Sequence, residues 1–138
     1  MRLAYCMKER WCSLLSIQFD PNKAIYAQIV DYYYQFICSG ELTPGEKLPS
    51  VRETAQTLQV NPNTVSRAYQ EMDRDELTFS KRGQGTFVTE DLRKITALKE
   101  TLAKAQVEAL ISYMKKLGYS SEEMIDSLKQ TVKEMDES

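Results

Sequence analysis

The stretch of residues 40–88 constrains the fold of this 138-residue chain more than any other part of it. It contains two helix starts. Ser50 precedes Glu53 by three positions, the spacing of a capping box, in which both side chains accept hydrogen bonds from backbone N–H groups at the helix start. Asn61 is a favoured N-cap residue, and Pro62 fits the first helical position because its missing N–H would be unpaired there anyway. The stretch therefore predicts two short helices in close succession.

The apolar spacing defines an inner face for each of these helices. The expected core positions are Val51, Ala55 and Leu58 in the first helix, and Val65, Ala68, Tyr69 and Met72 in the second. Only Gln59 and Val60 remain between them, so the connection is a tight turn. Two helices joined in this way form a helix-turn-helix, whose second helix presents its N-terminal polar residues to the major groove of DNA.

A short hairpin is predicted directly after the second helix. Residues 77–80 and 86–89 are strand candidates, and the connection between them contains Gly83 and Gly85. Glycines let a loop backbone approach another surface closely. Lys81 and Arg82 place positive charge at the tip, where a DNA backbone would be contacted. The order of the elements predicts a winged helix-turn-helix.

This order of motifs resembles the winged helix-turn-helix domain of the GntR family of bacterial transcription regulators. The matching residues are Ile25, Tyr26, Gln28, Ile29, Gly40, Leu42, Pro44, Gly45, Leu48, Pro49, Ser50, Arg52, Ala55, Leu58, Val60, Asn61, Asn63, Thr64, Val65, Arg67, Ala68, Tyr69, Arg82, Gly83, Gly85, Thr86, Phe87 and Val88. The short helical tail makes the chain look most like the YtrA subfamily. That resemblance implies local control of a neighbouring operon, often one that encodes a transporter.

The candidate DNA contacts lie on both helices and on the hairpin. The resemblance implies that Ser50 and Arg52 meet DNA. A cation in the first turn opposes the helix dipole, which favours an external anion as the partner of Arg52. The alternative, a salt bridge one turn on, is weakened because Gln56 is neutral. The full set of candidates is Ser50, Arg52, Asn61, Asn63, Thr64, Ser66, Arg67, Lys81, Arg82, Gly83 and Gly85.

On the second helix, Asn63 and Thr64 are the main candidates for groove contacts, since amide and hydroxyl groups pair with base edges. Ser66 is a further candidate for a base or a phosphate, whereas the side chain of Asn61 is expected to serve as the cap. Arg67 has two interpretations, a phosphate contact or an ion pair with an acid one turn on, Glu71.

One position departs from the family pattern. Glu76 stands between the second helix and the hairpin, where the family usually has a glycine. A non-glycine residue at positive φ costs about 1 kcal/mol. Either Glu76 adopts that strained conformation or the helix ends differently, so the departure affects the orientation of the hairpin rather than the fold.

Ahead of this stretch, residues 21–39 are predicted to form a helix that ends at Gly40. Its expected inner positions are Ile25, Ile29, Tyr33 and Ile37, with Tyr32 and Tyr34 at its edges as contacts or as surface aromatics. Residues 1–20 form an extension in which Leu3, Met7 and Trp11 share one helical face, continued by Leu14 or Leu15. The extension either packs against its own domain or a neighbour, or it adds a DNA or partner contact.

The cysteines do not indicate a metal centre. A structural zinc site needs four Cys or His ligands, and the chain has three cysteines, no CxxC pair and no histidine. Disulfides are disfavoured in the cytosol. Cys38 is therefore predicted to be a small core residue, and a redox switch at Cys6 or Cys12 is the weaker alternative.

From residue 90 the apolar period is helical up to Gly118, and Ser120 with Glu123 forms a capping box that starts another helix. Two helices cannot bury such a stripe alone, so pairing with a second copy into a four-helix core is expected. The predicted dimerisation residues are Ile95, Leu98, Leu102, Ala109, Tyr113, Leu117 and Leu128. So short a tail leaves little room for an effector pocket, which would lie between protomers or between tail and DNA-binding domain.

Composition narrows the function further. The formal net charge is −2, and this mild acidic excess lies largely in the tail. No apolar run reaches the roughly 18 residues of a membrane span, and no signal-peptide pattern is present, which predicts a cytoplasmic protein. The chain has no histidine, no nucleophile elbow and no Walker-type phosphate loop, so we expect neither an enzyme nor a cofactor or metal.

The sequence therefore predicts a mainly α protein with an extension at 1–20, a winged helix-turn-helix DNA-binding domain at 21–89 and a two-helix dimerisation domain at 90–138. Its expected function is that of a homodimeric transcription regulator, a repressor rather than an activator, on an inverted-repeat operator in double-stranded DNA, with or without a small-molecule effector. Two alternatives remain: a winged-helix module that binds protein and lacks salt-dependent DNA affinity, and an enzyme subunit active only in a complex.

Overall fold

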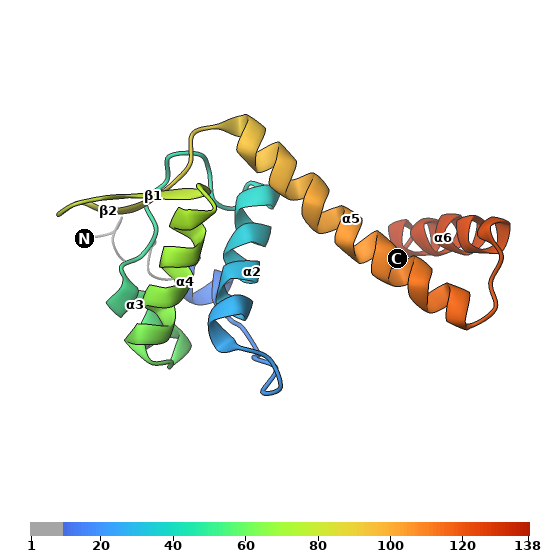
Figure 1. Ribbon diagram of the computed structural model, residues 1–138, viewed down its shortest axis with the longest axis horizontal. Helices are drawn as coiled ribbons and strands as arrows, with labels where there is room; N and C mark the ends of the chain where they lie inside the picture. The colour runs from blue at the N-terminus through green and yellow to red at the C-terminus, as the bar shows by residue number, and fades with distance from the viewer. Residues whose placement is uncertain (1–9) are drawn as a thin grey trace. The chain divides into compact units, whose positions relative to one another are not determined.

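The computed structural model describes residues 10–138, and the described chain is mainly helical (Figure 1). Residues 10–14 are helical. The elements that follow are the helices α2 (Ile25–Ser39), α3 (Val51–Leu58) and α4 (Pro62–Arg74), the strands β1 (Thr78–Lys81) and β2 (Gly85–Val88), and the helices α5 (Leu92–Lys116) and α6 (Ser121–Asp136). The predicted fold class, a winged helix-turn-helix followed by a helical tail, is confirmed.

The chain divides into two compact units, the first ending at Leu98 and the second formed by Lys99–Ser138. The long helix α5 crosses that boundary. The predicted domain bounds, 1–20, 21–89 and 90–138, concern what each part does, and they stay predictions.

The core of the first unit lies between α2 and α4, which run side by side, with α3 packed against α4 (Figure 1). The residues predicted for the inner face of α4 are all buried: Val65, Ala68, Tyr69 and Met72. The prediction for α3 is correct only for Ala55. Val51 and Leu58 are half-buried, and the fully buried residue of that helix is Thr54.

Thr54 is buried because a network of hydroxyl groups satisfies it. Its Oγ1 lies 3.0 Å from the hydroxyl oxygen of Tyr33 on α2 and 2.8 Å from that of Tyr69 on α4. The two tyrosine oxygens are 3.0 Å apart, and Tyr69 donates to the backbone oxygen of Pro49 at 2.7 Å. The three helices are thus joined by a buried polar cluster as well as by apolar packing.

The first of these helices begins later than predicted, at Ile25 rather than residue 21. The preceding residues form a turn in which Asn22 N–H donates to Asp20 Oδ1 at 2.9 Å. The helix ends as predicted at Gly40, whose φ of 86° is in the left-handed region. Its buried residues are Ile29, Tyr33, Tyr34 and Ile37, whereas Ile25 and Cys38 are half-buried.

The predicted burial of Tyr34 and of Cys38 was wrong. Tyr34 was expected at an edge of the helix, yet it is buried, and its hydroxyl donates to Asp75 just after α4. Cys38 was expected in the core, but it lies at the flank of the inner face and is half-buried.

The predicted helix starts differ in how fully they form. Asn61 Oδ1 accepts from Asn63 N–H at 2.8 Å, as predicted for an N-cap. At Ser120 the complete capping box forms, with bonds of 3.2 and 3.0 Å to and from Glu123. Only half of the box forms at Ser50, which accepts from Glu53 N–H at 3.1 Å. Within residues 10–138 the Glu53 carboxylate makes no return bond, and it lines a cleft beside the hairpin instead.

Glu76 adopts the strained of the two predicted conformations, with a φ of 61°. It occupies the position that glycine favours in a Schellman motif. Leu77 N–H donates to Met72 O at 3.1 Å, and Glu76 N–H donates to Asp73 O at 3.0 Å, so α4 closes in the usual way. The Glu76 carboxylate accepts from Lys94 Nζ at 2.9 Å. The hairpin therefore leaves α4 in the direction that a glycine would give.

The hairpin, or wing, is an antiparallel pair in which Phe79 faces Phe87 and Lys81 faces Gly85. Its strands are displaced by one residue from those predicted, because Lys81 and Gly85 belong to the ladder and the turn contains only residues 82–84. A third segment lies along the other edge of β2. Leu48 N–H donates to Thr86 O at 2.8 Å, and Gly45 N–H donates to Val88 O at 2.9 Å. The wing is thus attached to the chain that leads into α3.

The described part of the N-terminal extension packs on this unit. Trp11 and Leu15 are buried, and the Trp11 ring lies 6.2 Å from that of Tyr33 between centroids. Arg10 forms an ion pair with Glu46. Packing against its own domain, one of the predicted alternatives, is therefore confirmed for residues 10–15. The predictions for Leu3, Cys6 and Met7 lie outside the described residues.

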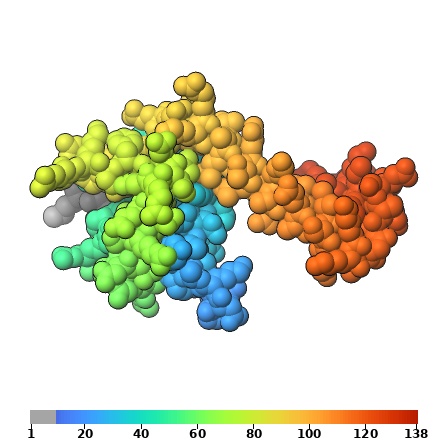
Figure 2. Space-filling view, in the orientation of Figure 1, coloured from blue at the N-terminus to red at the C-terminus, as the bar shows by residue number. Residues whose placement is uncertain are grey.

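The second unit contrasts with the first, because no residue of α5 or α6 is buried. Figure 2 shows the surface of this unit in orange and red. Of the predicted dimerisation residues, Ile95, Leu98 and Leu102 are half-buried. The others, Ala109, Tyr113, Leu117 and Leu128, are exposed. No helix in the described chain has the length and apolar character needed to cross a bilayer.

Candidate nucleic-acid interface

The face of α4 that points away from the core carries most of the polar candidates. Asn61, Asn63 and Arg67 are exposed, and Thr64 and Ser66 are half-buried. The side chain of Asn61 is occupied by its cap hydrogen bond, as expected. Asn63 uses only its backbone N–H in that cap, so its carboxamide is available to a base edge.

Arg52 stands exposed in the first turn of α3. Neither the ion pairs nor the hydrogen bonds found in residues 10–138 involve its guanidinium, so the alternative of a salt bridge within the protein does not form there. The Ser50 hydroxyl accepts the cap bond and keeps its own O–H to donate. Both groups could serve an external anion.

Arg67 has a partner that the sequence did not suggest. Its guanidinium carbon lies 3.8 Å from the ring centroid of Tyr26 on α2. The predicted alternative, an ion pair with Glu71, is wrong because Glu71 pairs instead with Arg74, at 3.2 Å. The other interpretation, a phosphate contact through the N–H edge of the Arg67 guanidinium, stays a prediction.

The wing presents two further cations. Lys81 Nζ lies 5.5 and 5.3 Å from the ring centroids of Phe79 and Phe87, which face each other across the ladder. Arg82 is exposed in the turn, beside Gly83 with a φ of 77°. Gly85 is favoured by its φ of 119°, and a Cβ there would lie 2.8 Å from Lys47 Cε. The aliphatic stem of Lys47 thus lies against the wing backbone.

A cleft of about 420 Å³ separates the wing from the start of α3. Its positively charged lining residues are Lys47, Lys81 and Arg82, against a single acid, Glu53. Ser50 and the glycines of the wing also line it. This charge balance favours an anionic backbone, although the net charge of the whole chain is −2. The structure thus places the predicted Ser50, Lys81, Arg82, Gly83 and Gly85 around one cleft.

Two residues that fix the geometry of this region were missed in the sequence. Asp73 near the end of α4 accepts hydrogen bonds from Thr78 and, at 2.6 Å, from Ser80 of β1. Ser80 Oγ lies 3.0 Å from Thr86 Oγ1 on β2, so the bonds continue across the wing. Tyr26 is the other: it is among the residues that match the family, but its contact with Arg67 was not predicted. Neither role has a local sequence signal, since each residue acts on a different element.

The core beneath the interface holds protonated tyrosines. Burial raises the pKa of Tyr33 and of Tyr69 above the ordinary value. Burial also raises the pKa of Tyr34, with a further contribution from its hydrogen bond to the Asp75 carboxylate. These hydroxyls therefore remain hydrogen-bond donors throughout the neutral pH range.

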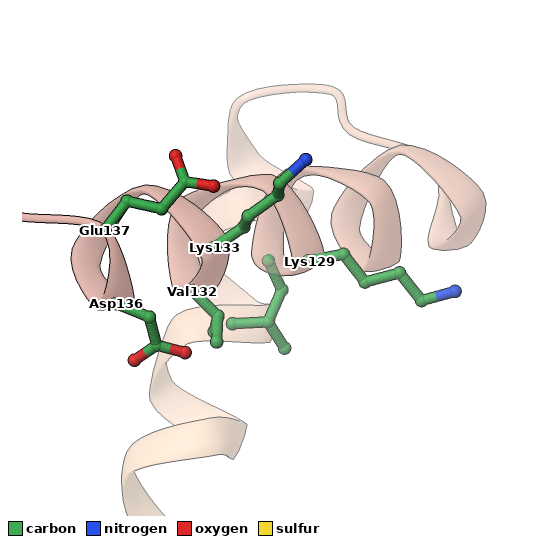
Figure 3. A pocket seen from close by; sticks show the side chains of 6 residues that line it. Lys129, Val132, Lys133, Asp136 and Glu137 are labelled. Atoms are coloured by element: carbon green, nitrogen blue, oxygen red, sulfur yellow. The ribbon is translucent and has the colours of Figure 1, made fainter.

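A second concavity, of about 540 Å³, lies on α6 (Figure 3). It is lined by Leu128, Lys129, Val132, Lys133, Asp136 and Glu137. Five of these residues belong to α6 and Glu137 follows its last residue, and the labelled side chains spread in different directions rather than converging. A small-molecule site needs polar groups fixed around an enclosed volume. The geometry of this surface therefore does not indicate a small-molecule site.

The chain is similar to known proteins in sequence and in fold. The model of the family described as bacterial regulatory proteins, gntR family, matches residues 25–88. The HTH-type transcriptional regulator YhcF of Bacillus subtilis (strain 168) is 44% identical over 112 residues, 81% of this chain and 93% of that protein. The HTH-type transcriptional repressor YtrA of the same organism is 40% identical over 101 residues, 67% of this chain and 78% of that protein. A solved GntR family transcriptional regulator from Listeria monocytogenes superposes with a TM-score of 0.78, at 45% identity, over 81% of this chain and 98% of its own.

Proposed function

Because this chain belongs to the GntR family of bacterial regulatory proteins, we propose that it is a homodimeric repressor that binds an inverted-repeat operator. The family and the relatives are transcriptional regulators rather than enzymes, and the chain carries their helix-turn-helix DNA-binding domain. The proposal goes further in three respects: the residues that meet DNA, the dimer, and the sign of regulation.

The observation that carries the DNA-binding assignment is the polarity of α4. One side of the helix is buried by Val65, Ala68, Tyr69 and Met72, while the opposite side exposes Asn63 and Arg67 near its N-terminus. Arg52 and the cations of the wing lie on the neighbouring elements of the same unit. In our proposal Asn63 and Thr64 read base edges, and Arg52, Lys81 and Arg82 hold phosphates.

The dimer is proposed from the second unit. Within residues 10–138, the exposed large hydrophobic side chains all lie on or between α5 and α6, and all except Leu92 belong to the second unit. Two such hairpins of helices, one from each copy, would bury these side chains in a four-helix core. The two-fold axis would then set two recognition helices on half-sites about 34 Å, one helical turn of DNA, apart.

Repression of a neighbouring operon is proposed from two sources. One relative is named as a repressor, and the short helical tail resembles the subfamily of that protein. An effector, if one acts, would bind between protomers and change the spacing of the recognition helices. Identical half-site spacing with and without a validated inducer would contradict that mechanism.

The test of DNA recognition is binding of the purified chain to its own upstream DNA and to scrambled DNA across a salt series. We expect Asn63→Ala to lose about 1–3 kcal/mol of discrimination between the two DNAs. Arg52→Ala should weaken binding to both and make the dependence on salt shallower by about one counterion. Arg74→Ala is the matched control for Arg52→Ala. It removes the same charge, but from the C-terminal end of α4, away from the N-terminal end that carries Asn63.

Equal binding of specific and scrambled DNA at every salt concentration would contradict operator recognition on that DNA. Selection from random-sequence duplexes would then decide the matter. If selection returned no enriched site, sequence-specific binding itself would be contradicted.

A further inference from the structure

The contact between Arg67 and Tyr26 is the shortest cation–ring contact in the described chain, at 3.8 Å from guanidinium carbon to ring centroid. It joins two helices, since Tyr26 lies in the first turn of α2 and Arg67 lies in the second turn of α4. Tyr26 is half-buried and Arg67 is exposed. The ring is therefore held by the protein, while the guanidinium lies at the surface.

The position of Arg67 on its helix places it beside the expected DNA contacts. It follows Asn63 by four residues, so the two side chains lie on the same face of α4. Side chains on a helix point back toward its N-terminus. The Arg67 guanidinium consequently lies toward the end of α4 that carries Asn63 and Thr64.

Other partners for Arg67 are lacking in residues 10–138. The acid one turn on, Glu71, pairs with Arg74 at 3.2 Å. The remaining ion pairs of the described chain join other residues. A guanidinium stacked on a ring keeps its N–H donors at the edge of its plane, where they can bond to a planar or phosphate acceptor.

We infer that Tyr26 is a positioning residue for DNA recognition, whose ring fixes the plane of the Arg67 guanidinium and directs its N–H edge to the DNA. The inference rests on the proposed DNA-binding face of α4. A long arginine side chain loses rotamer freedom when it binds. The stack orders Arg67 before binding, so that this loss is smaller on contact with DNA.

The experiment is a double-mutant cycle on the full-length protein, with DNA affinity measured by fluorescence anisotropy on a duplex that the wild type binds specifically. Tyr26→Leu removes the ring, and Tyr26→Phe keeps it. Both are made with Arg67 present and with Arg67→Ala. Urea unfolding of each variant reports any change in the stability of the fold.

We expect Tyr26→Leu to weaken binding roughly two- to fivefold, the range of an exposed cation–π contact. Tyr26→Phe should stay within about twofold of the wild type, because its ring offers the same face to the cation. In the Arg67→Ala background, Tyr26→Leu should cause no further loss. This pattern separates positioning through Arg67 from a general loss of stability.

Three results would overturn the inference while leaving the proposed function intact: an equal effect of Tyr26→Leu with and without Arg67, an equal loss in Tyr26→Phe, or full affinity in Arg67→Ala. Failure of the wild type to bind any DNA specifically, including duplexes selected from a random pool, would overturn the inference and the proposed function together.

Discussion

The two units of this protein differ in what they bury. The first unit encloses Ile29, Tyr33, Val65 and Met72 completely and joins its three helices through the hydroxyl network around Thr54. The second unit is built from longer helices, yet none of their residues is buried. Ordered local structure is thus not a sign of a complete core. The first unit satisfies its own side chains, whereas the second leaves apolar surface exposed, as the proposed dimer requires.

The largest effect is expected from breaking that partner surface. The double variant Tyr113→Asp/Leu117→Asp places two charges on residues that are 62% and 58% exposed. If they meet a second copy, the dimer dissociates, because unpaired charges are excluded from an apolar interface. Operator affinity should then fall by about 100-fold or more, since the second half-site is no longer tethered. Sedimentation equilibrium and anisotropy measure the two effects.

The matched control for that prediction is Gln106→Asp/Ser112→Asp, which puts the same charges at exposed polar positions of α5. It should remain dimeric. A Tyr113→Asp/Leu117→Asp protein with unchanged mass in solution would show that this surface is not the interface.

Within the first unit, Thr54→Val tests the hydroxyl network. Valine fills nearly the same volume but leaves Tyr33 and Tyr69 with one fewer partner in the core. We expect a loss of about 1–3 kcal/mol in the free energy of unfolding, measured in urea. Thr57→Val is the control, because the Thr57 hydroxyl is exposed and bonds only to a backbone oxygen of its own helix. Equal losses in the two variants would contradict the role assigned to the network.

Alkaline pH should affect the first unit for the same reason. Burial raises the pKa of Tyr33, Tyr34 and Tyr69 above the ordinary value of 10.0, so the folded chain keeps three protons that the unfolded chain releases. Stability is therefore unaffected below about pH 10 and falls as the pH rises above it. Urea unfolding between pH 8 and 11 measures the decline. It should be smaller in Tyr33→Phe, and a pH profile identical to that of the wild type would contradict the assignment.

The smallest effect on stability is expected at Glu76, just after the end of α4. Glu76→Gly relieves a φ of 61°, and we expect a gain of about 1 kcal/mol in the free energy of unfolding. The exposed ion pair with Lys94 contributes little in return. Gln70→Gly, at an exposed right-handed helical position within α4, should lose stability instead. A loss in both variants would show that Glu76 is not strained.

The sequence was sufficient for several features whose cause is local. The caps at Asn61 and Ser120 and the inner face of α4 all follow from residues within one or two turns, whereas for Glu76 the family pattern left two conformations open. The same patterns identified the winged helix-turn-helix.

What could not be predicted depends on contacts between distant parts of the chain. The hydroxyl that satisfies the buried Thr54 comes from Tyr33, which is 21 residues away in the sequence. The acceptor for the hydroxyl of the buried Tyr34 is Asp75, which lies 41 residues further along the chain. The stack of Arg67 on Tyr26 and the bonds of Asp73 to the wing are likewise products of the packed structure. The individual DNA-contacting and dimerisation residues stay predictions until they are measured.

The most direct test of the difference between the units is amide hydrogen exchange of the full-length protein across a dilution series. The account predicts that amides of α5 and α6 lose protection as the concentration falls below the dimer dissociation constant, while those of α2 and α4 stay protected. Protection of α5 and α6 that does not change with concentration, at dilutions where sedimentation shows a monomer, would contradict it.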